Sequence, residues 1–220
     1  MYFSKTAAVL LLTGSLAFAQ TLESGKFYVG ANLGINIPSV DSRSNDAGRV
    51  TSMSLGEVGA IYDLHAGWRV YLENSFHGLE FSFKDTNGEG NYVVNSSSNL
   101  GGSFYTNESY ELSYKGGYEF TPKTYVTGRF GYGRIDVDHA IRGSTEIQNG
   151  TFSNSLDLFI LGLGMEYSIT SNINITAEYS YRFAEDIDKR HMYLDNSGDY
   201  TDIKAEFTDH SILLGVNYIF

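Results

Sequence analysis

The chain contains no cysteine, only two prolines, and fewer Lys and Arg residues (15) than Asp and Glu residues (26). Without cysteine, the fold cannot rely on disulfide bonds. The formal net charge of −11 argues against a nucleic-acid partner, which would require a basic face. With 17 Tyr, 14 Phe and 24 Gly, the composition is typical of closely packed strands and does not suit a disordered chain.

A long hydrophobic run occurs only at the start, in "MYFSKTAAVLLLTGSLAFAQ". Lys5 precedes the apolar segment Ala7–Leu12, and Ala17–Ala19 has the small-x-small pattern of a cleavage site. This predicts a secretory signal peptide over residues 1–19, with Gln20 as the first mature residue. A membrane-anchoring helix is the alternative, but residues 13–15 interrupt the run, which is shorter than the ~20 residues needed to span a bilayer.

Beyond residue 20 the sequence has no apolar stretch of helix length, so an exported chain of this kind could be periplasmic, secreted or an outer-membrane barrel. In "FYVGANLGINI" every second residue from Phe27 to Ile37 is apolar, over a length that can cross a bilayer as a tilted strand. In the later segment 157–167, the otherwise polar face carries two apolar residues, Leu158 and Ile160. Eight segments show this alternation: 27–37, 56–68, 77–84, 109–120, 124–133, 157–167, 173–183 and 211–220.

The connections alternate between short and long. Short turns are expected near 69–74, 121–123 and 169–172, and long polar loops near 38–54, 85–107, 136–154 and 184–209. Outer-membrane barrels divide their periplasmic turns and extracellular loops in this way, and an even strand count lets both termini face the periplasm. The sequence therefore predicts one all-β domain over residues 20–220, an eight-stranded antiparallel transmembrane up-and-down β-barrel.

The polar face distinguishes a membrane barrel from a soluble one. It mixes charges of both signs with Gly, Ser, Asn and Thr, as a narrow interior filled by side chains requires. The apolar face carries Trp68, Tyr118, Tyr167 and Tyr218 near the turns, where aromatic girdles mark membrane interfaces. Charges inside must pair, and they would form a salt-bridged plug or, less favoured, line a water-filled path. The predicted lumen charge network is Glu57, Glu80, Lys115, Glu119, Arg129, Glu166, Glu178 and Arg182.

The segments "FYVGANLGINIP", "GWRVYLENSFHGLEFSF", "GRFGYGRI", "LGLGMEYSITSNINITAEYSYRF" and "LLGVNYIF" resemble the outer-membrane β-barrel family of OmpA-like transmembrane domains and opacity or surface-antigen proteins. The resemblance covers essentially the whole mature chain through loose alternations. It implies that a C-terminal assembly signal, Leu214, Val216, Tyr218 and Phe220, is read by the barrel-assembly machinery. The resemblance does not extend to the C-terminal peptidoglycan-binding domain of OmpA-type proteins, so we expect no cell-wall tether from it.

We expect no catalytic residues, metal or cofactor. In "DHS", His210 and Ser211 are adjacent on a strand and therefore point to opposite faces. The acidic residues Asp195, Asp199 and Asp202 do not match the spacing of a calcium loop. An enzyme that modifies lipid remains a third hypothesis.

The favoured prediction is a monomeric, non-enzymatic integral outer-membrane protein, with a role in envelope integrity or in interactions made by its surface loops. A narrow channel for small solutes or ions is the alternative. Expected partners are outer-membrane lipid, lipopolysaccharide and the barrel-assembly machinery, with an extracellular ligand or host surface at the loop tips near 41–50, 89–99, 142–149 and 190–200.

Overall fold

The computed structural model describes residues 25–46, 49–53, 58–95, 100–142, 150–184, 187–193 and 200–220. The predicted signal peptide, Gln20 and Glu57 lie outside these residues, as do parts of the predicted loop tips. Within the described ranges, no helix has the length and apolar character needed to cross a membrane.

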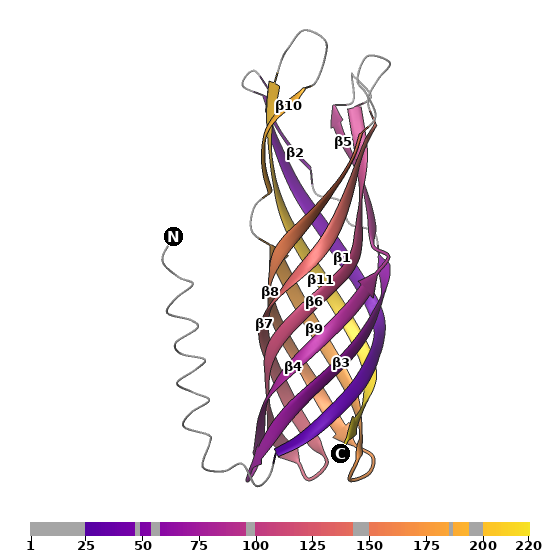
Figure 1. Cartoon of the computed structure of the whole chain (residues 1–220), viewed down its shortest axis with the longest axis vertical. Coiled ribbons are helices and arrows are strands. Elements are labelled where there is room, and N and C mark those ends of the chain that lie inside the picture. Colours follow the sequence, from indigo (N-terminus) through magenta and orange to yellow (C-terminus); the bar gives the residue numbers. More distant parts are fainter. Residues whose placement is uncertain are drawn as a thin grey trace, which may run out of the picture.

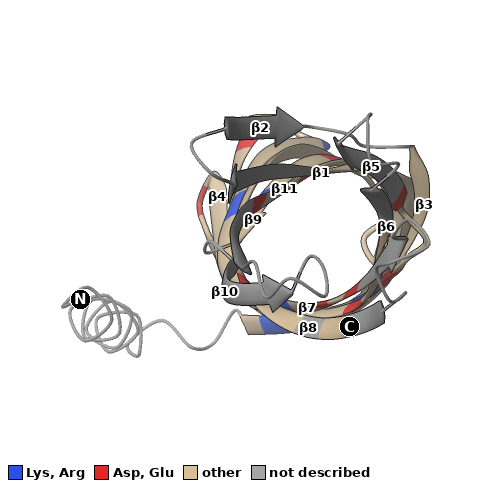
Figure 2. Ribbon diagram, turned by 90° about the horizontal axis from the view of Figure 1, so that it is seen from above, with Lys and Arg blue, Asp and Glu red and all other residues tan. Residues whose placement is uncertain are grey.

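Eight long antiparallel strands form one closed barrel (Figures 1 and 2). Pairing of the last strand with the first closes the sheet, which confirms the predicted fold. Three shorter strands extend the barrel at the end opposite the short turns (Figure 1). The long strands are β1 (Gly25–Asp46), β3 (Gly59–Leu72), β4 (Ser75–Thr86), β6 (Leu100–Thr121), β7 (Thr124–Arg142), β8 (Gly150–Ser168), β9 (Ile173–Ala184) and β11 (Tyr200–Ile219); the short ones are β2 (Arg49–Met53), β5 (Glu89–Asn95) and β10 (Ile187–Tyr193).

Strands occupy much of the four segments that the sequence predicted to be long loops. The strands β1, β6, β7, β8 and β11 continue well into the four segments that we expected to be structureless, and β2, β5 and β10 lie wholly within them. Strand pairing satisfies backbone hydrogen bonds that a long loop would leave to water, and alternating polar residues do not prevent it. The first turn is also shorter: β3 reaches Leu72, and the turn is made by Glu73, at φ 38°, and Asn74.

The register sets the width of the barrel. Following cross-strand partners once around the barrel from Ser75 leads back to β4 at Asp85, ten residues further along. Eight strands with this shear tilt by about 40° and enclose a space that side chains can fill. The partners on this circuit are Ser75, Tyr118, Val126, Met165, Ala177, Leu214, Leu33, Tyr62 and Asp85.

This circuit begins at Ser75 and ends at Asp85, which are both polar. The outward residues between them belong to an apolar belt around the barrel. Phe81, Leu161 and Leu214 are 51%, 52% and 61% exposed, whereas Glu80 and Arg182 are buried inside. The apolar face therefore points outward, as the sequence predicts. At the edge of the belt away from the short turns, four outward aromatic residues have a polar residue as the next outward neighbour on their own strand: Phe83 has Asp85, Tyr110 has Glu108, Tyr132 has Arg134 and Phe159 has Asp157.

Above the belt the two faces exchange character. On β7 the inward residues change from Gly131 and Gly133 to Ile135 and Val137, while the outward residues become charged. This is the arrangement of a barrel wall with water outside, so the barrel protrudes beyond the belt at the end opposite the short turns. The inward residues there form an apolar cluster of Phe104, Ile135, Val137, Leu156, Leu158 and Phe207.

Candidate functional site

The interior of the barrel at the level of the belt holds a network of buried ion pairs. Among the described residues, the Lys and Arg ion pairs join five carboxylates to five basic side chains, so the network is electrically neutral. No member is more than 8% exposed. The members are Arg69, Glu80, Lys84, Glu111, Lys115, Arg129, Glu166, Glu178, Arg182 and Asp209.

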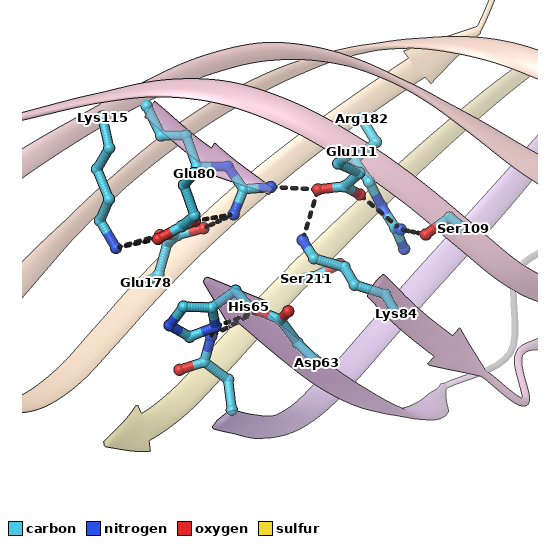
Figure 3. Close-up of polar contacts among 12 residues, drawn as sticks. Asp63, His65, Glu80, Lys84, Ser109, Glu111, Lys115, Glu178, Arg182 and Ser211 are labelled. Atoms are coloured by element: carbon cyan, nitrogen blue, oxygen red, sulfur yellow. Dashed lines mark hydrogen bonds and ion pairs between the residues drawn. The ribbon is translucent and has the colours of Figure 1, made fainter. Parts of the chain in front are cut away.

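Arg129 lies at the centre of this network. Its guanidinium donates to Glu178 at 3.0 Å and to Glu80 at 3.4 Å, and it forms a close ion pair with Glu111. Lys115 approaches the same two carboxylates, with Nζ 3.5 Å from Glu80 and 3.6 Å from Glu178. Glu80 and Glu178 are therefore each shared by Arg129 and Lys115. Figure 3 labels Lys115 and the two carboxylates.

Glu111 connects the centre to the upper part of the network. Its carboxylate lies 2.9 Å from Lys84 Nζ and 3.3 Å from Arg182 Nη1, in addition to its contact with Arg129 (Figure 3). Arg182 also donates from Nε to Asp209 at 2.8 Å, and its Nη2 forms a close contact with the same carboxylate. A forked guanidinium can hold two carboxylates in this way, which a single ammonium cannot do in a fixed geometry.

Arg69 lies at the end of the lumen nearest the turns. It donates to Glu166 at 2.8 Å, and Asn174 donates to the same carboxylate at 3.2 Å. The guanidinium carbon of Arg69 lies 4.3 Å from the ring centroid of Tyr28 and 4.7 Å from that of Phe76. These aromatic contacts cover the faces of a planar cation that is only 1% exposed.

A second polar cluster surrounds His65. Its Nδ1 lies 3.5 Å from Asp63, and its Nε2 lies 2.7 Å from the side-chain oxygen of Asn217. Asn32 donates to Asp63 at 2.6 Å and accepts a hydrogen bond from Thr176 at 3.0 Å. The cluster therefore links the neighbouring strands β9, β11, β1 and β3, and among the described residues no ion pair joins it to the network around Arg129.

The structure brings together six of the eight residues expected in the lumen charge network: Glu80, Lys115, Arg129, Glu166, Glu178 and Arg182. Glu119 is half-exposed near the turn between β6 and β7, and it forms no ion pair with the described residues. Glu57 lies outside the described residues.

Four further members were not expected in the network. Lys84 and Glu111 alternate with apolar residues, so their position on the polar face was already evident from the sequence. Arg69 and Asp209 were assigned to a predicted turn and a predicted loop, because the strands there are longer than the alternation indicated. The predicted list had more acidic than basic residues. In the structure, Arg69 and Lys84 raise the number of basic members so that it equals the number of acidic ones.

The described residues contain no group of three or more His, Cys, Asp or Glu side chains that could hold a metal ion. His210 is exposed on the outer face, and its Nδ1 lies 2.7 Å from the hydroxyl of Tyr179. Ser211 is 1% exposed inside the barrel. The two side chains are therefore separated by the barrel wall, as strand geometry requires.

A family model for the outer membrane protein beta-barrel domain matches residues 6–220. The chain belongs to the outer membrane protein β-barrel family. Membership and the closed barrel together imply a location in the outer membrane. No curated protein matches the chain.

Solved structures of outer-membrane proteins are similar to this chain at low sequence identity. OprG from Pseudomonas aeruginosa is 11% identical with a TM-score of 0.58, covering 90% of this chain and 96% of that chain. The outer membrane protease OmpT from Escherichia coli is 12% identical with a TM-score of 0.54, covering 89% and 97%. Ail, the attachment invasion locus protein of Yersinia pestis, is 18% identical with a TM-score of 0.38, covering 86% and 99%. At these identities the likeness to OprG and OmpT concerns the fold alone.

The residues of the predicted assembly signal all lie on the outer face near the turn end of the barrel. The backbone nitrogen of Phe220 donates to the carbonyl of Phe27 at 3.0 Å, next to the seam between β11 and β1. Recognition of the predicted assembly signal by the barrel-assembly machinery stays a prediction. Leu214, Val216, Tyr218 and Phe220 are 61%, 50%, 46% and 66% exposed.

Proposed function

We propose that this chain is a non-enzymatic outer-membrane protein with a closed lumen, which acts through the part of the barrel that protrudes from the membrane and through its loops. The observation that carries the proposal is the neutral network of buried ion pairs, which occupies the interior from Arg69 to Asp209. An eight-stranded barrel has little space beyond its own side chains.

Two layers oppose the passage of ions. A permeating ion would have to separate pairs such as Arg129–Glu178, and an unpaired charge in this interior costs several kcal/mol. Above the pairs, the apolar cluster that includes Ile135, Leu158 and Phe207 would exclude water from the end of the lumen opposite the short turns. These layers favour a plug over a water-filled path.

The protruding part supports a role at the cell surface. On β7 the wall continues from Arg134 to Arg142 above the belt, which corresponds to roughly 20 Å of height for tilted strands. Outward side chains there include Asp136 and Ser155, whose hydroxyl donates to Asp136 at 2.6 Å. Loops carried on such a rigid wall are suited to binding, so we place the interaction surface at this end.

Planar-bilayer recordings of the refolded protein test the closed lumen. We expect no steady conductance from the wild-type protein. Arg134→Ala is a matched control, because Arg134 is exposed outside the barrel whereas Arg129 is buried within it. A steady conductance that changes with Arg129→Ala and not with Arg134→Ala would support the alternative, a narrow channel.

The environments of His65 and His210 support the non-enzymatic part of the proposal. His65 is buried in the lumen, and His210 is separated from Ser211 by the barrel wall. Mass spectrometry of lipid A from cells with and without the gene should therefore give the same masses. A mass difference that the gene restores would identify a lipid-modifying enzyme.

Replacing residues 143–149 and 194–199 by short Gly-Ser linkers separates the two surface roles. If the loops bind an extracellular partner, cells carrying this variant should lose adhesion but keep wild-type resistance to detergent. If the barrel instead serves envelope integrity, deletion of the gene should lower resistance to detergent, and the variant should restore it fully with no change in adhesion.

A further inference from the structure

The outer face of the barrel has a hollow in the apolar belt. It has a volume of about 1220 Å³ and is lined by residues from β4 and from β6 to β9, reaching His210 on β11. Two glycines form its floor: Gly116 and Gly128 are cross-strand partners, and both occupy outward positions between large apolar residues. Tyr114 and Phe130, with ring centroids 5.0 Å apart, form the wall above them.

The protein's own packing does not require these two glycines. A Cβ at Gly128 would have no heavy atom within 4 Å, and one at Gly116 would lie 3.5 Å from its nearest neighbour, in Tyr114. Inward glycines differ: a Cβ at Gly117 would collide with the ring of Phe76, and one at Gly215 with Asn32. Glycine inside a strand weakens it and often marks a place where a ligand approaches closely.

The position of the hollow identifies the medium that it faces. Gly128 lies four residues after Thr124, the first residue of β7, so the floor is about 10 Å above the turns. The apolar band of such barrels is about 25 Å tall. The floor is therefore in the half of the belt nearest the short turns, which face the periplasm in this family.

Polar atoms occupy the end of the hollow nearest the turn between β3 and β4. Ser75 is the first residue of β4, and its hydroxyl lies 3.5 Å from Nε2 of His77. The other ring nitrogen of His77 forms a short hydrogen bond with the hydroxyl of Tyr114. A lipid in the periplasmic leaflet has its ester and headgroup oxygens at this level and its acyl chains above, so its polarity matches that of the hollow.

We propose that the hollow on Gly116 and Gly128 is a binding site for a phospholipid of the periplasmic leaflet, with an acyl chain lying on the glycine floor. Pockets of about 300–1,000 Å³ hold drug-sized ligands, so the volume is sufficient for such a chain. A second copy of the barrel fits less well. In a two-fold dimer the same patch faces itself, so a hollow at the axis would face an identical hollow and leave a void.

Photo-crosslinking tests the site. The full-length protein is refolded into phosphatidylethanolamine vesicles that contain a trace of the same lipid with a diazirine on one acyl chain. We expect labelling concentrated on the peptides of β6, β7 and β8 around the hollow. Labelling spread evenly around the barrel would contradict the proposal.

The double variant Gly116→Leu/Gly128→Leu fills the floor and should lower labelling of these peptides at least fivefold. The single variant Gly128→Leu is the milder test, since nothing lies within 4 Å of the added Cβ. Ala31→Leu is the matched control, because Ala31 is an outward residue of β1 on the opposite side of the barrel. Folding of each variant is checked by heat-modifiable gel migration.

Two further results would overturn the inference. One is unchanged labelling in both folded glycine variants. The other is a wild-type dimer, detected by native mass spectrometry, that Gly128→Leu converts to a monomer, because it would identify a second copy as the occupant.

Discussion

Replacing Arg129 by methionine should destabilise the barrel strongly. Arg129 is 4% exposed and lies within 3.4 Å of three carboxylates, those of Glu80, Glu111 and Glu178. Methionine fills a similar length of space without a charge, so the change removes the cation and leaves these carboxylates in a low-dielectric interior. Breaking a buried ion pair from one side costs about 3–5 kcal/mol.

The remaining contacts determine where in this range the cost falls. Each of the three carboxylates keeps another cation: Glu80 and Glu178 keep Lys115, and Glu111 keeps Lys84. We therefore expect a loss of about 3 kcal/mol in the free energy of unfolding, near the lower end. Adding Glu178→Gln to Arg129→Met should recover part of the loss, because the amide removes one of the stranded charges.

Equilibrium unfolding by guanidinium chloride in lipid vesicles measures this effect. Trp68 is the only tryptophan and reports folding by its fluorescence. Glu119→Gln is the control and should change stability by less than about 0.5 kcal/mol, because Glu119 is half-exposed near a turn. If Arg129→Met costs no more than Glu119→Gln, or if adding Glu178→Gln increases the loss, the network does not stabilise the fold as described.

Three further predictions concern the belt and the part above it. Leu163→Lys, in the middle of the lipid-facing surface of β8, should cost about 2–4 kcal/mol in the same unfolding assay, whereas Ser153→Lys above the belt should cost less than about 1 kcal/mol; equal costs would contradict the assigned boundary. Leu158→Ala should cost about 2–5 kcal/mol, because Leu158 is fully buried in the apolar cluster; a loss below about 1 kcal/mol would show that the cluster is loosely packed. Trp68 fluorescence should be quenched more by lipids brominated near the headgroup than by lipids brominated near the chain end, since Trp68 lies on the turn side of the belt; the reverse order would place the membrane wrongly.

The sequence alone determined the architecture, because alternation has a local cause. Successive side chains of a strand point to opposite faces. The residues of a segment such as "FYVGANLGINI" that share a face can therefore be identified before any partner strand is known. Short turns near 121–123 and 169–172 were predicted for the same reason, since the alternation stops there. The polar face likewise identified most members of the lumen network, including Arg129 and Arg182.

Tertiary structure decided which charges pair and where the strands end. Arg69 and Asp209 join the network because cross-strand register, set only on barrel closure, brings them beside Glu166 and Arg182. The upper strand extensions escaped prediction because the faces exchange character there. From the sequence alone, the segment with Asp136 and Val137 was predicted to be a polar loop. In the barrel, Asp136 points outward, and Val137 packs inside against apolar residues of neighbouring strands. The glycine hollow is likewise visible only after closure, because Gly116 and Gly128 are twelve residues apart in sequence and become neighbours only when β6 pairs with β7.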